Sequence, residues 1–101
     1  MTQLSTNLRD PAVRPYFLWD EKTTVAEFRS AIELAQPHEW ARLVGKMMRE
    51  ARDTDVWHFV SPREVWRHRA QLDRYLGRRR DFWHYLLDGW NRDGFLGQDG
   101  E

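Results

Sequence analysis

The chain has 101 residues, no cysteine, and equal numbers of acidic and basic side chains, so its formal net charge at pH 7 is zero. The lack of cysteine excludes disulfides, thiolate zinc ligands and thiol nucleophiles, and the neutral balance argues against a dedicated nucleic-acid-binding protein. Because the sequence contains neither a secretory leader pattern nor an apolar run long enough to span a bilayer, we expect a cytoplasmic protein without a membrane partner.

Hydrophobic periodicity indicates an all-α fold, a compact bundle of four main helices with a short helical connector and an extended N-terminal strap. No strand pattern is present. We expect residues 1–14 to be a flexible N-terminus, residues 15–96 to form a single helical domain, and residues 97–101 to form a short acidic tail.

The strap is the run at residues 15–20, in which four apolar residues follow a proline that favours extended backbone. Its rings must be covered, either by the chain's own helices or by a partner, since Trp and Tyr are frequent anchors at protein interfaces. Tyr16, Phe17 and Trp19 are therefore candidate partner-binding residues.

Two helices follow the strap. A capping box at residues 24–27, with Thr24 and Glu27 as its polar members, opens a helix over 24–35. Pro37 suits the first position of a second helix, and apolar residues then recur at helical spacing up to residue 51. The next segment, residues 53–60, is short and aromatic, and predicts one helical turn capped by Asp55.

A third long helix is predicted over residues 62–76, opened by a capping box at Ser61 and Glu64 and ended by Gly77. Asp81 can cap a last helix that Gly94 ends. Gly45 and Gly89 lie inside predicted helices, where glycine costs about 1 kcal/mol relative to alanine. We therefore expect another helix to approach closely at both glycines.

Residues 61–80 contain seven Arg, one Glu and one Asp, for a net charge of +5. At 100° per residue, several of these Arg side chains project opposite the apolar stripe of the third helix and form a straight basic ridge. The ridge either meets phosphates or an acidic protein surface, or is simply a solvated face. Its candidate members are Arg63, Arg67, Arg74, Arg78, Arg79 and Arg80.

Two further residues of the third helix fit its stripe poorly. Arg69 projects toward the apolar side, and Trp66 lies well away from it. Both are candidate partner-binding residues, although Trp66 can instead fill a groove within the chain and Arg69 can lay its methylenes on the core.

Catalytic chemistry finds little support in the sequence. The four histidines are dispersed at positions 38, 58, 68 and 84, without the spacing of metal ligands, and Asp53 and Asp55 are expected at helix ends. No glycine-rich phosphate loop is present. We expect no enzyme activity, no catalytic residues, no metal site and no cofactor.

Several short strings carry a family resemblance: PYFLWDE at 15–21, REARD at 49–53, DVW at 55–57, SP at 61–62 and GRRR at 77–80. In these strings the chain resembles, over roughly residues 15–96, a group of small bacterial proteins encoded beside AbiEii-type nucleotidyltransferase toxins. The resemblance implies an antitoxin-like or accessory protein that binds the nucleotidyltransferase in a toxin-antitoxin or phage-defence pair. The chain lacks the β-wing pattern of winged-helix AbiEi antitoxins, so the resemblance does not imply autoregulation through DNA. The alternative, which rests on the Arg ridge, is a small nucleic-acid-binding regulator.

Overall fold

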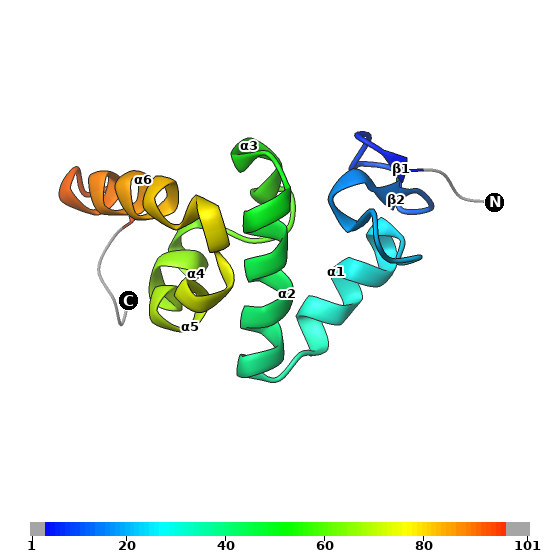
Figure 1. Ribbon diagram of the computed structural model, residues 1–101, viewed down its shortest axis with the longest axis horizontal. Helices are drawn as coiled ribbons and strands as arrows, with labels where there is room; N and C mark the ends of the chain where they lie inside the picture. Colours follow the sequence, from blue (N-terminus) through cyan, green and yellow to red (C-terminus); the bar gives the residue numbers. More distant parts are fainter. Residues whose placement is uncertain (1–3, 97–101) are drawn as a thin grey trace.

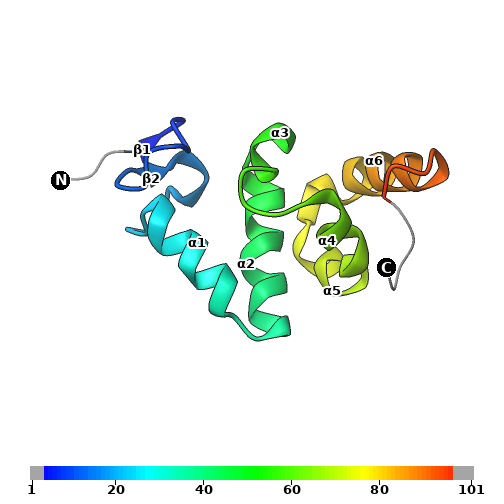
Figure 2. The same cartoon turned by 180° about the vertical axis from the view of Figure 1, so that it is seen from behind.

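A computed structural model describes residues 4–96 and confirms the mostly helical fold. Its helices are η1 (Tyr16–Leu18), α1 (Val25–Leu34), α2 (Pro37–Glu50), α3 (Asp53–Val56), α4 (Pro62–Arg67), α5 (Arg69–Leu72), η2 (Asp73–Tyr75), η3 (Gly77–Arg79) and α6 (Arg80–Arg92), and its strands are β1 (Leu4–Ser5) and β2 (Arg14–Pro15). The helix α2 runs through the middle, between α1 on one side and α4 and α5 on the other (Figures 1 and 2). The strands and α6 lie at opposite ends of the molecule (Figure 1). Within residues 4–96, each helix is too short or too polar to cross a membrane.

The expectation of a flexible N-terminus without strands is wrong from residue 4 onward. The two-residue strands β1 and β2 pair in parallel, with Leu4 opposite Arg14 and Ser5 opposite Pro15. Leu8, in the loop between them, is buried in the core. A pair this short gives no readable alternation of polar and apolar residues, so the sequence carried no strand signal. The predicted acidic tail at 97–101 lies outside the described residues.

The strap is also not extended along its whole length. Pro15 has the extended backbone expected of it, but η1 follows at once as a turn of 3-10 helix. Phe17 and Leu18 are buried against the helices, whereas Trp19 is 61% exposed. The chain's own core therefore covers the apolar part of the strap, one of the two alternatives that the sequence left open.

The predicted starts of three helices are confirmed. Capping boxes open α1 at Thr24 and α4 at Ser61, and Pro37 is the first residue of α2. Two predicted caps are wrong, because α3 begins after Arg52 and α6 after Arg79. Asp55 and Asp81 instead lie in the first turns of these helices, where a carboxylate still interacts favourably with the helix dipole.

The third long helix is broken into α4, α5 and η2. His68 leaves helical geometry, with φ −106° and ψ 19°, and its ring lies on the Trp40 ring at a centroid distance of 4.9 Å. No glycine or proline marks this break, so local sequence did not predict it. The apolar stripe survives the break, because Val65, Leu72 and Leu76 are all buried as expected. Gly77 ends the segment with a positive φ of 56°.

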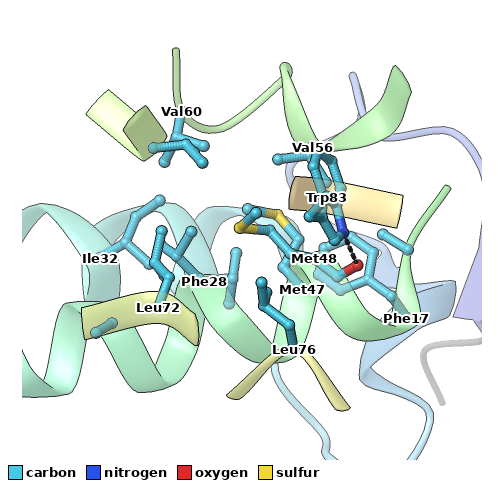
Figure 3. Close-up of a cluster of buried hydrophobic side chains, with 14 of the residues drawn as sticks. Phe17, Phe28, Ile32, Met47, Met48, Val56, Val60, Leu72, Leu76 and Trp83 are labelled. Atoms are coloured by element: carbon cyan, nitrogen blue, oxygen red, sulfur yellow. Dashed lines mark hydrogen bonds between the residues drawn. The ribbon is translucent and has the colours of Figure 1, made fainter. Parts of the chain in front are cut away.

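The core surrounds α2, and α6 is attached to it through Trp83 (Figure 3). The fully buried indole of Trp83 donates a hydrogen bond to the Met48 carbonyl at 2.9 Å. Close approach is confirmed at Gly45, where an added Cβ would overlap the Cβ of Tyr75 in η2. It is absent at Gly89, where among residues 4–96 an added Cβ would meet only the Arg92 side chain, at 3.7 Å.

Candidate functional site

A groove of about 460 Å³ lies between the α4–α5 segment and α6. Two of the sequence-predicted partner-binding residues, Trp66 and Arg69, belong to its lining. The break at His68 separates α4 from α5, so the two residues sit on different helices yet face the same hollow. The complete lining is Trp66, Arg69, Ala70, Asp73, His84, Leu87 and Asp88.

Trp66 and Arg69 form a stacked pair in this groove. The Trp66 side chain is largely buried, and the Arg69 guanidinium lies 3.7 Å from its ring centroid. The guanidinium also donates to the Trp66 carbonyl at 2.6 Å, which holds it flat on the ring. A cation held over an indole in this way gains about 0.5–2 kcal/mol. The sequence predicted an unusual position for each residue but not their contact with each other.

Two carboxylates line the rest of the groove, Asp73 from η2 and Asp88 from α6. His84 Nε2 contacts a carboxylate oxygen of Asp73, and Arg80 lies 3.4 Å from the other oxygen. Asp88 is exposed and forms no ion pair within residues 4–96. The groove therefore combines an apolar floor, from Trp66, Ala70 and Leu87, with a free carboxylate at its rim.

Sequence reasoning missed the α6 side of the groove. His84 and Asp88 are one helical turn apart, and Leu87 lies between them on the same side of the helix. That spacing shows only that the three side chains are neighbours. The spacing does not indicate that α5 and Asp73 lie against these three side chains, because that packing depends on where the predicted third helix breaks.

The strap residues lie elsewhere. The Tyr16 hydroxyl donates to Asp55 at 2.5 Å and accepts from the Arg52 backbone N–H at 2.8 Å. Burial, followed by the hydrogen bond to the Asp55 carboxylate, raises the pKa of Tyr16. Phe17 is buried among other aromatic rings, and Trp19 is exposed directly after η1. Tyr16 and Phe17 thus stabilise the fold, and Trp19 alone remains available to a partner.

The straight basic ridge is not present, because no continuous helix carries its members. Arg79 donates to the Ala51 carbonyl and stacks on Phe82, and Arg80 pairs with Asp73. Arg63 donates to the Leu96 carbonyl at 3.2 Å. These three Arg side chains have roles inside the fold. The other three members, Arg67, Arg74 and Arg78, are exposed.

A second, smaller hollow of about 320 Å³ lies beside the first turn of α2, where the Trp40 and His68 rings meet at an interplanar angle of 56°. Its two carboxylates belong to Glu33 and to Glu64, and Glu64 is held in the capping box of α4. Within residues 4–96 the structure contains no group of three His, Asp or Glu side chains placed to hold a metal ion.

The chain matches no protein-family model, no curated protein and no solved structure.

Proposed function

We propose that this chain is a non-catalytic binding protein whose groove between α5 and α6 receives a side chain of a protein partner. The stacked Trp66–Arg69 pair carries the proposal. Trp and Arg are the residue types most enriched among binding hot spots, and here they line a concave surface. A partner side chain entering the groove would cover the remaining apolar surface of Trp66 and Leu87.

The charge of the groove favours a basic partner residue. Arg69 is held on Trp66 and to a backbone carbonyl, and Asp73 is shared between His84 and Arg80. Asp88 remains as the carboxylate without an ion pair among residues 4–96. A Lys or Arg of the partner could lay its methylenes on Trp66 and place its charge at Asp88.

The sequence resemblance suggests which partner this is. A nucleotidyltransferase binds nucleotides and RNA, so the surface around its active site must attract phosphates. An antitoxin-like protein that presents a carboxylate and an aromatic floor to such a surface would compete with those phosphates. We therefore propose an AbiEii-type nucleotidyltransferase as the partner, in a toxin-antitoxin or phage-defence pair.

The test is co-expression with an AbiEii-type nucleotidyltransferase from the same organism, followed by size-exclusion chromatography and a growth assay. We expect one co-eluting complex and rescue from toxicity. Asp88→Arg should weaken the complex by about tenfold or more, through charge repulsion at the groove. Asp93→Arg is the matched control, because it makes the same charge change at the end of the same helix, outside the groove.

Two separate peaks at micromolar concentration, with no rescue, would exclude this partner. Equal effects of the Asp88 and Asp93 substitutions would exclude the groove as the binding site. Both variants should keep the wild-type melting temperature, since both side chains are exposed and neither forms an ion pair within residues 4–96.

The nucleic-acid alternative has weaker support than the groove. It depends on six Arg side chains on one ridge, and three of them are held by contacts within the chain. Retention of duplex DNA or RNA in a filter-binding assay, with a strong dependence on salt, would revive it.

A further inference from the structure

Gly89 lies in the interior of α6, and no contact within residues 4–96 explains why this position is a glycine. Glycine is unfavourable in a helix interior, so it usually marks a place where another backbone or a ring comes close. Gly45 follows this rule, since Tyr75 occupies the space that its Cβ would need. At Gly89 that space contains only the Arg92 side chain, at the distance of ordinary van der Waals contact.

The surface around Gly89 is unusual for a solvent-exposed helix face. Tyr85, one turn before the glycine, is 79% exposed, and Phe82, one turn earlier, is 38% exposed. Arg92 follows one turn after the glycine and is also exposed. Phe82, Tyr85, Gly89 and Arg92 thus follow one another at spacings of three and four residues along one side of α6. This docking face borders the groove at Asp88, which lies one turn before Arg92, whereas the other groove residues of α6, His84 and Leu87, point further round the helix.

The docking face is complementary to itself when a second copy is reversed upon it. In an antiparallel pair centred at the level of Leu87, Tyr85 of each copy lies opposite Gly89 of the other. Each large ring then meets the one residue that has no side chain. At both ends of the pair, Arg92 of one copy lies at the level of Phe82 of the other, one residue from Asp81, which its long side chain reaches. Neither Arg92 nor Asp81 forms an ion pair within residues 4–96. Asp81 lies one turn before Tyr85, so it is at the edge of the same face.

The position of α6 leaves this arrangement free of obstruction. The helix lies at one end of the molecule, and its C-terminal end is the part farthest from the strands in both views (Figures 1 and 2). Trp83 and Leu87 bind α6 to the core from its other side. We propose that the docking face of α6 is a homodimer interface, at which a second copy of this chain packs its own α6 in antiparallel orientation, with Tyr85 on Gly89 and Arg92 beside Asp81.

One helix from each copy makes a small interface, below the roughly 1,200 Å² of stable complexes, so we expect a weak dimer. Sedimentation velocity over about 5–500 µM protein should show reversible growth from the monomer mass towards twice that mass. Gly89→Leu should weaken the association by about tenfold or more, because its side chain occupies the space of the opposing ring. The matched control is Asn91→Leu, which adds the same side chain on the same helix outside the docking face and should leave the dissociation constant unchanged.

We expect the Gly89→Leu variant to fold, so a loss of self-association in this variant would not be caused by unfolding. Because a Cβ at position 89 meets no clash, Gly89→Ala should raise the melting temperature of the dilute monomer by roughly 4 °C or more. A gain in helix stability together with a loss of self-association is a combination that a purely structural glycine does not produce. A wild-type chain that stays monomeric throughout the concentration range would overturn the proposal, as would a Gly89→Leu variant that associates as the wild type does.

A charge exchange tests the antiparallel orientation. Asp81→Arg and Arg92→Asp should each weaken the dimer, because each places like charges opposite one another at both ends. The double variant restores both pairs and should recover wild-type association. Failure of the double variant to recover would exclude the antiparallel pairing. The groove proposal is tested by Asp88→Arg and partner binding, and the dimer by the charge exchange between Asp81 and Arg92, which lie outside the groove lining, so the two proposals can fail independently.

Discussion

The substitution Trp83→Phe tests how α6 is attached to the rest of the molecule. Near the end of α2, the Arg52 N–H, which a continuing helix would direct to the Met48 carbonyl, donates instead to the Tyr16 hydroxyl. The Met48 carbonyl accepts the indole N–H of Trp83 at 2.9 Å, inside the core (Figure 3). Phenylalanine would keep an aromatic ring at position 83 but leave this buried carbonyl without that donor.

The expected loss in the free energy of unfolding is the sum of two contributions. An unsatisfied buried carbonyl costs about 1–3 kcal/mol. The smaller ring also gives up about 40 Å² of buried apolar surface, which corresponds to about 1 kcal/mol. We therefore expect Trp83→Phe to lower the free energy of unfolding by about 2–4 kcal/mol. For a domain of this size, that loss lowers the melting temperature by about 10–20 °C.

Thermal and urea unfolding followed by circular dichroism measures this loss. Trp57→Phe is the control, because the Trp57 ring packs edge-on against Trp83 at 5.7 Å, is only half-buried, and forms no indole hydrogen bond within residues 4–96. It should cost less than about 1.5 kcal/mol. If the two variants lose the same stability, the reasoning from the buried hydrogen bond is refuted.

Three further predictions concern stability. Gly45→Ala should destabilise the chain by about 1–3 kcal/mol in urea unfolding, despite the better helix propensity of alanine, because its Cβ overlaps Tyr75; a stabilised variant would contradict this. Thr24→Ala removes the side-chain acceptor of the α1 capping box and should cost about 1 kcal/mol in the same assay; an unchanged midpoint would contradict it. The hydrogen bond from Lys46 lowers the pKa of Asp20, so this pair stabilises the fold above the ordinary pKa of aspartate and is lost as pH falls through the lowered value. In an NMR titration, Lys46→Met should raise the pKa of Asp20, and an unchanged pKa would show that the contact is absent in solution.

The local features of this protein were readable from its sequence. The capping boxes at Thr24 and Ser61, Pro37 at the start of α2, and the glycine at position 77 all occur where predicted. Gly94 likewise has positive φ, as expected at a helix end. Each of these signals acts between residues at most four apart, through a cap, a ring constraint or a left-handed backbone. They determined the class of fold and most helix boundaries.

The candidate groove was only partly predictable. Trp66 and Arg69 could be selected because they fit the apolar stripe of a continuous helix poorly, and both line the groove. Their partners on α6 could not, since His84 and Asp88 look like ordinary exposed residues of an amphipathic helix. The Arg ridge failed for the same reason that the groove exists: the helix that should have carried it breaks at His68.

By itself, then, the sequence determined where most helices begin and end, because caps and helix stops depend on neighbours in the chain. Tertiary structure alone decided that β1 pairs with β2, that His68 leaves the helix beside Trp40, and that Trp83 completes the hydrogen bonding at the end of α2. These contacts join residues 10 to 35 positions apart. Their free energy comes from burial and from polar groups removed from water, and both depend on which segments meet in three dimensions.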